Sequence, residues 1–117
     1  MLIRIDPSSG VPLFDQLAGS IRASAIAGTL ALGERLPSAR ELAASLDINV
    51  HTVLRAYQLL RDEGLIKLRP GRGAIVTGLP SGDYESLNAA VDAVIAEARK
   101  LDIAPAALAA LIRETYQ

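Results

Sequence analysis

The stretch Leu36–Thr77 constrains the fold more than any other part of this 117-residue chain. Ser38, with Glu41 close behind it, has the signature of a capping box at a helix start, and Asn49 is a favourable cap for a second helix. Two β-type runs follow, joined by a turn that contains Gly71–Gly73. This order of elements predicts a winged helix-turn-helix, a shape that places one helix in the major groove of DNA.

The residues before this stretch predict one more helix. Proline is tolerated in a first helical turn and glycine ends a helix without steric cost, so a helix is expected from near Pro12 to Gly28. Residues 2–5 could form a short extended segment, and residues 29–36 are expected to form a loop.

The second helix of the motif carries an apolar stripe that should pack on the core, leaving a polar side outward. Tyr57 belongs to this stripe and is therefore interpreted as a core residue, not as one that stacks on a base. The strands are expected over residues 65–69 and 74–77, so the wing is predicted to be a two-stranded hairpin. The predicted stripe consists of Val53, Ala56, Tyr57 and Leu60.

Two more helices are predicted beyond a linker at residues 78–82. One covers residues 84–101 and the other begins at Pro105, and their connection is so short that an antiparallel pair is expected. The predicted fold class is therefore mostly α with a small β-hairpin. It comprises a winged helix-turn-helix DNA-binding domain over residues 1–77 and a two-helix C-terminal dimerisation tail over residues 83–117.

The tail predicts self-association. Two helices rich in Ala and Leu cannot enclose much core between themselves, and the leftover apolar surface needs a cover. A symmetric partner tail is the most economical one, while packing onto the chain's own first helix is the alternative, and both could occur. The predicted dimerisation residues are Leu87, Val91, Val94, Ile95, Leu101, Leu108, Leu111 and Ile112.

Composition excludes several classes of protein. The chain has no cysteine and a single histidine, which removes disulfides, cysteine nucleophiles and multi-histidine metal sites. No paired acids with a base in a glycine-bounded pocket are recognisable, so we expect no enzyme activity, metal or cofactor. No apolar run approaches the roughly 20 residues of a membrane span, and the N-terminus lacks a signal-peptide core. We therefore expect a cytoplasmic protein.

Charge is a weak guide to the partner. The net charge is −1, but residues 1–77 carry nine Lys/Arg and seven Asp/Glu, giving +2, while residues 78–117 carry three and six, giving −3. The placement of the charges must therefore carry the argument. Polar side chains gather at the start of the predicted recognition helix, and basic ones line the wing. The DNA-binding residues predicted from this placement are Ser38, Arg40, Asn49, His51, Thr52, Arg55, Lys67, Arg69 and Arg72.

Four of these residues also have an interpretation without DNA. His51 could be a solvated polar residue, and Arg72 an ordinary charge in a turn. Arg40 could pair with Glu41 or another surface acid, and Arg55 with an acidic neighbour on its own helix. The joint placement of polar and basic residues on one face is a stronger signal than any single member.

Taken together, these motifs resemble the GntR family of bacterial transcription regulators, and within it the YtrA-like subfamily. The resemblance covers about residues 1–77 closely, and residues 78–117 match the short two-helix tail of that subfamily in size. The chain departs from the subfamily at Val50 and His51, where proline and asparagine are common, and at Asp47, where the turn commonly has glycine. The carrying residues are Gly28–Leu30, Gly33, Leu36–Ser38, Arg40–Ala43, Asn49, Thr52–Val53, Arg55–Tyr57, Leu60, Glu63–Leu65 and the Gly-Arg-Gly turn, and the start, Ile5–Gln16, also resembles the family's opening helix.

The resemblance implies a homodimer that binds an inverted-repeat operator on double-stranded DNA and represses transcription, often of its own operon and of transporter genes. It also implies that Gly73 lies at or beside a position used for DNA contact, which makes ten predicted contact residues. A small-molecule effector of unknown identity could release it, although no residue cluster argues for a particular ligand. The near-neutral charge leaves open an alternative, a winged-helix protein-interaction module with weak DNA affinity.

Overall fold

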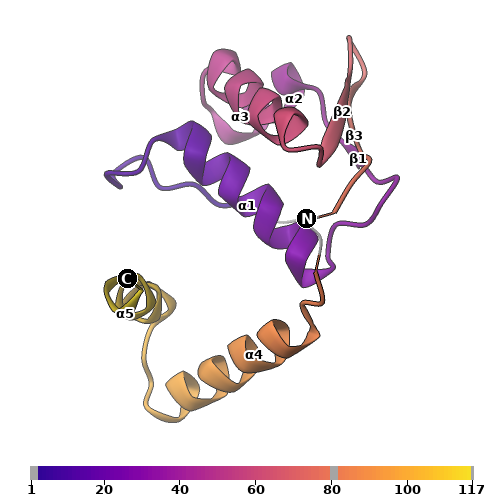
Figure 1. The fold of residues 1–117 in the computed structure, drawn as a ribbon. Coiled ribbons are helices and arrows are strands. Elements are labelled where there is room, and N and C mark those ends of the chain that lie inside the picture. Colours follow the sequence, from indigo (N-terminus) through magenta and orange to yellow (C-terminus); the bar gives the residue numbers. More distant parts are fainter. Residues whose placement is uncertain (1–2, 80–81, 117) are drawn as a thin grey trace. The chain divides into compact units, whose positions relative to one another are not determined.

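The computed structural model describes residues 3–79 and 82–116 and divides into two compact units, Met1–Gly82 and Asp83–Gln117. We call them the winged unit and the tail unit (Figure 1). Five helices and one small sheet are formed by the described residues, which agrees with the predicted fold class except for one added strand. The elements are α1 Leu13–Ala27, β1 Arg35–Leu36, α2 Ala39–Leu46, α3 Val50–Asp62, β2 Ile66–Arg69, β3 Gly73–Val76, α4 Glu85–Lys100 and α5 Pro105–Thr115.

Helix α1 begins and ends where its sequence signals it. Pro12 caps its start, and Gly28 ends it in the left-handed conformation with φ of 83°. The predicted extended segment is not a strand at residues 3–5, and its first residue lies outside the described part of the chain. The buried face of α1 consists of Leu17, Ala18, Ile21 and Ala25.

The helix-turn-helix is fastened by side-chain caps at both helix starts. Ser38 Oγ accepts a hydrogen bond from the Glu41 amide at 3.1 Å, and Asn49 Oδ1 accepts one from the His51 amide at 2.8 Å. Between the helices, Asp47 takes the left-handed conformation with φ of 55°, which aspartate tolerates better than most residues. The predicted caps and turn are therefore confirmed, although the capping box is half formed, since the Ser38 amide makes no hydrogen bond to the Glu41 side chain among the described residues.

The sheet has three strands, and the predicted two-stranded wing was incomplete. Residues 35 and 36, expected in a loop, form β1, so the order is β1-β3-β2 with both pairs antiparallel. The Gly33 amide also donates to Val76 O at 2.8 Å, and the Val76 amide donates to Glu34 O at 3.0 Å. These bonds tie the wing to the segment that leads into α2.

One glycine makes the close approach of β1 and β3 possible. Gly73 has φ of +85°, and a Cβ there would overlap the carbonyl oxygen of Leu36 and lie 2.9 Å from the carbonyl carbon of Pro37. No other residue type fits at this position without moving the backbone. Gly73 is thus required by the packing of the sheet, whatever its role towards a ligand.

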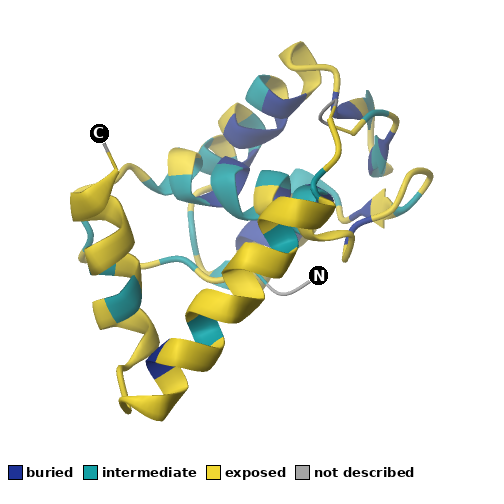
Figure 2. Cartoon of the chain, turned by 60° about the horizontal axis from the view of Figure 1, so that its bottom comes forward, coloured by how far each residue is buried: buried dark blue, intermediate teal, exposed yellow. Residues whose placement is uncertain are grey.

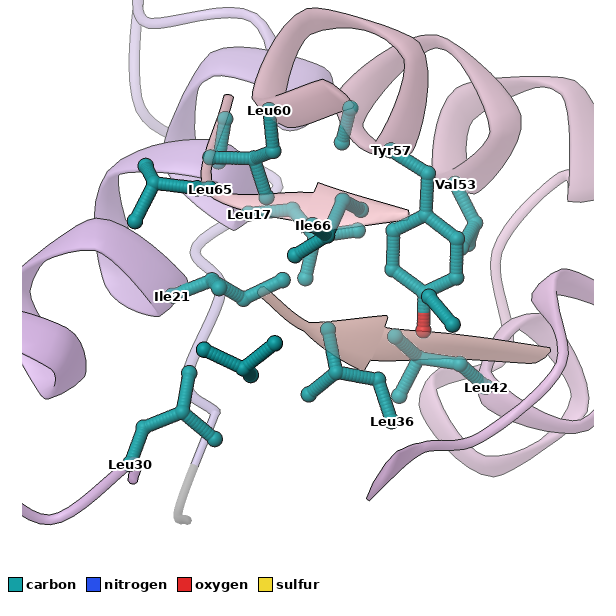
Figure 3. Packing of buried hydrophobic residues seen from close by; sticks show 14 of the residues in the cluster. Leu17, Ile21, Leu30, Leu36, Leu42, Val53, Tyr57, Leu60, Leu65 and Ile66 are labelled. Atoms are coloured by element: carbon teal, nitrogen blue, oxygen red, sulfur yellow. The ribbon is translucent and has the colours of Figure 1, made fainter. Parts of the chain in front are cut away.

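A single core closes the winged unit. Helix α3 packs against α1, α2 and β2, and its predicted stripe is confirmed, because all four residues are at most 1 % exposed. Figure 3 shows Leu17 and Ile21 from α1 directed at the same interior as Leu60 and Tyr57. The Tyr57 hydroxyl donates to Pro37 O at 2.7 Å, which satisfies the polar tip of this buried ring. Burial, followed by the nearby Glu41 carboxylate, raises the pKa of Tyr57.

The tail unit is open, and the predicted antiparallel pair is wrong. Figures 1 and 2 both show α5 leaving the turn at a steep angle to α4, so the helices do not lie side by side. Asp102 takes the left-handed conformation with φ of 53°, and Pro105 starts α5 soon after, so the chain bends without folding back along α4. Among the described tail residues only Ala98 is buried.

An apolar groove of about 710 Å³ lies between α4 and α5. Six of the eight predicted dimerisation residues line it, and Leu101 and Leu111 line a second groove within the tail unit. No helix within the described residues is long and apolar enough to cross a membrane. The first groove is lined by Leu87, Val91, Val94, Ile95, Leu108 and Ile112, together with Ile103, Arg99 and smaller apolar neighbours.

Candidate nucleic-acid interface

The outward side of α3 carries the predicted recognition residues. His51 and Arg55 lie four residues apart, hence on one side of the helix, and both are exposed. Asn49 is exposed at the cap and Thr52 is half-buried in the first turn of the helix. Because the opposite side of α3 is fixed in the core, these side chains stand on a rigid support.

The start of α2 adds a hydroxyl and a cation. Ser38 Oγ serves as the cap acceptor, which leaves its O–H proton available to a phosphate oxygen. Arg40 is exposed, and the alternative pairing with Glu41 does not occur in the described part of the chain. The Tyr57 bond to Pro37 O holds the backbone immediately before this helix start.

The wing presents three more cations. Lys67 and Arg69 are exposed on β2 and alternate with apolar residues, as the sequence predicts. Arg72 is exposed in the turn, which its own amide closes by donating to Arg69 O at 2.8 Å. Gly71 and Gly73 flank it with φ of 72° and 85°, so its side chain has no bulky neighbour in sequence.

The predicted DNA-contacting cations differ from Arg22 and Arg61 in their ion pairing. Arg22 pairs with Glu63 at 2.7 Å, and Arg61 pairs with Asp62 at 3.2 Å. No acid lies within ion-pair distance of any of the five predicted DNA-contacting cations over residues 3–79 and 82–116. Their charge is therefore available to an external anion such as phosphate. These five are Arg40, Arg55, Lys67, Arg69 and Arg72.

One contact in this region has no counterpart in the sequence analysis. The Arg55 guanidinium lies over the ring of Phe14, with Cζ 3.7 Å from the ring centroid. Arg55 was expected to contact DNA or pair with an acid on its own helix, and Phe14 was assigned no role. Only the packing of α1 against α3 brings the two together, so no local pattern could have revealed the contact.

Asp47 is the feature of this region that the structure explains only in part. Its backbone is left-handed, and aspartate tolerates this conformation better than most residues, so the residue type fits the turn. Nothing in the structure explains its negative charge beside the candidate interface.

Among the described residues, no group of His, Cys, Asp or Glu side chains gathers so that it could hold a metal ion.

Comparison with known proteins identifies the family to which the winged unit is similar. The family described as "Bacterial regulatory proteins, gntR family" matches residues 13–76, which span α1 to the end of β3. The repressor YtrA of Bacillus subtilis is 37 % identical over 76 residues, covering 65 % of this chain and 58 % of YtrA. The chain therefore spans less than two thirds of that relative.

Two further relatives extend the match into the tail. The transcriptional regulator Rv1152 of Mycobacterium tuberculosis is 34 % identical over 101 residues, covering 86 % of this chain and 83 % of Rv1152. The structure of YtrA from Sulfolobus acidocaldarius, a GntR-family transcription factor, aligns with a TM-score of 0.61 at 34 % identity, covering 86 % of this chain and 99 % of that one. This family and these relatives are transcriptional regulators and not enzymes, and the present chain belongs to the GntR family of bacterial regulatory proteins.

Proposed function

We propose that this chain is a sequence-specific DNA-binding repressor that acts as a homodimer on an inverted-repeat operator. One observation carries the proposal: a rigid helix presents hydrogen-bonding side chains outward, beside five cations without acidic partners among the described residues. In this arrangement α3 enters the major groove, while the wing and the start of α2 contact phosphates. By residue, the proposed contacts are Ser38, Arg40, Asn49, His51, Thr52, Arg55, Lys67, Arg69, Arg72 and Gly73.

The proposed dimer forms through the tail. Leucine and valine side chains on α4 and α5 stay exposed around an open groove, and a second tail would cover them. Two-fold symmetry would then place two recognition helices about one helical turn of DNA apart, or a multiple of it. The winged domain over residues 1–77 would read DNA, the linker 78–82 would join it to the tail, and the dimer would obstruct polymerase in the cytoplasm.

Regulation of its own operon and of transporter genes rests on the resemblance to YtrA-like repressors, and an effector remains unassigned. The tail groove is nearly all apolar, and Arg99 is the one charged residue that lines it within the described part of the chain, which does not select a particular ligand. The competing candidate, a protein-interaction module, is favoured only by the net charge of −1.

Selection from a random DNA pool at physiological salt tests the proposal. Enrichment of an inverted repeat by the purified full chain is the expected result, and it also yields the operator. A folded, dimeric protein that enriches no sequence, with or without cell metabolites, would contradict DNA reading and favour the protein-interaction module.

Substitution of two arginines on α3 then tests which part of this helix contacts DNA. Arg55→Ala should weaken operator binding by about 1–3 kcal/mol and relax the preference at one base pair per half-site. Arg61→Ala, which removes an exposed arginine already paired with Asp62, should leave affinity nearly unchanged. Equal weakening on all sequences by Arg55→Ala would make Arg55 a phosphate contact. Equal effects of both substitutions would place the interface elsewhere on the helix.

A further inference from the structure

The contact between Phe14 and Arg55 joins the first turn of α1 to the outward side of α3. A cation within about 6 Å of an aromatic centroid is attracted by the electron density on the ring face. At 3.7 Å the guanidinium is well inside this range. No acid pairs with Arg55 in the described part of the chain, so the ring takes the place that an acidic neighbour was expected to occupy.

The ring is held firmly from behind. Phe14 is half-buried and packs against the core cluster of the winged unit. The start of α1 is fastened by Gln16, whose side-chain amide donates to Asp6 O at 3.0 Å and to Val11 O at 2.8 Å. The Asp6 amide donates back to Gln16 Oε1 at 2.7 Å. The backbone around Phe14 is thus tied down, and its ring offers a supported face on which the Arg55 guanidinium rests.

The geometry of a guanidinium allows it to be stacked and to bind at the same time. Its N–H donors point outward in the plane of the group, while a ring covers only one of its two faces. The donors of Arg55 thus stay free for guanine O6 and N7 or for phosphate oxygens. A free arginine side chain loses rotamer entropy when it is fixed, and stacking before binding removes part of that cost.

We propose that Phe14 is a positioning residue that holds the Arg55 guanidinium ready for DNA, although it makes no DNA contact of its own. This inference rests on the proposed function, since it assumes that Arg55 meets DNA. It assigns a role in recognition to α1, which carries none of the ten predicted contact residues. The preference of the site would then depend on an aromatic side chain outside the helix-turn-helix.

A double-mutant cycle tests the proposal on the full chain and the selected operator at fixed salt. Phe14→Leu keeps an apolar side chain against the core but removes the ring face, and should weaken binding about twofold to fivefold, corresponding to the usual strength of an exposed cation–π contact. Phe14→Tyr should bind within about twofold of the wild type. In the Arg55→Ala background, Phe14→Leu should cause no further loss.

A spectroscopic signature separates positioning from general packing. In the free wild-type protein the Arg55 Nε–H resonance should be shifted by the ring current, and Phe14→Leu should move it to the position of an unstacked arginine. Phe14→Met serves as a second apolar variant should the leucine protein fold poorly. Equal losses from Phe14→Leu in both backgrounds, or an unmoved resonance, would overturn the proposal while leaving DNA binding intact. Failure of the wild type to bind DNA would instead overturn the proposed function, and this inference with it.

Discussion

The two units use similar apolar residues in opposite ways. In the winged unit Leu17 and Leu60 are completely buried, whereas in the tail unit Leu101 and Leu111 are 71 % and 56 % exposed. The winged unit has three helices and a sheet around one interior, while two diverging helices have no interior to share. The comparison teaches that apolar content alone does not make a core: the number and direction of the elements decide whether the same leucines are covered.

The largest expected effect comes from removing one leucine in each unit. Leu60→Ala leaves a cavity in a closed core and should lower the free energy of unfolding by about 2–5 kcal/mol, measured by urea denaturation. Leu111→Ala removes a side chain already half in solvent, so at dilute concentration it should change that free energy little. Sedimentation should instead show weaker self-association. Equal losses in dilute urea unfolding would mean that the tail has a closed core of its own.

The next effect sharpens the contrast within the winged unit. Gly73→Ala meets both a left-handed backbone and the carbonyl group of Leu36, and should cost roughly 2–4 kcal/mol. Gly71→Ala meets the backbone strain alone, because nothing lies within 4 Å of its added Cβ. Thermal unfolding of the two variants should therefore separate clearly. Matching melting temperatures would show that β1 does not hold the wing closely.

The smallest expected effect concerns the polar tip in the closed core. Tyr57→Phe keeps the ring but leaves Pro37 O without its donor, and should cost about 1 kcal/mol in urea unfolding. The raised pKa adds a dependence on pH: folding favours the protonated hydroxyl, so this contribution is complete below the ordinary tyrosine pKa of about 10 and declines at higher pH. Tyr57→Phe should therefore lose less stability than the wild type above pH 10. Parallel alkaline profiles would exclude Tyr57 as the source.

Local signals predicted most of the fold. The helix caps at Ser38 and Asn49 and the end of α1 at Gly28 depend on residues adjacent in sequence, and each is found as expected. Strand β1 could not be predicted from the sequence, because a strand of two residues, Arg35 and Leu36, is too short to show an alternating pattern. It forms because β3 lies beside it. The angle between α4 and α5 could not be predicted either, because a short connection limits the distance between the helix ends but not the direction of the second helix.

The candidate site likewise has a part that the sequence predicts and a part that it does not. Nine of the ten predicted residues follow from helix spacing and from the composition of the wing, and Gly73 follows from the family resemblance. The structure places the ten residues on α2 and α3, at their N-terminal caps and along the wing. Phe14 could not be predicted as a neighbour of Arg55, because their contact depends on how two helices distant in sequence pack. Whether the ten residues touch DNA is a proposal that the selection experiment tests.

The order of the sheet has a consequence for aggregation. With β3 in the centre, β2 has one edge whose backbone groups lack a neighbouring strand, and such edges invite pairing with another chain. Lys67 and Arg69 stand exposed on that strand and Pro70 follows it directly, three features that oppose strand addition. The cations proposed to meet phosphate would thus also keep two wings from joining edge to edge when many copies crowd on one stretch of DNA.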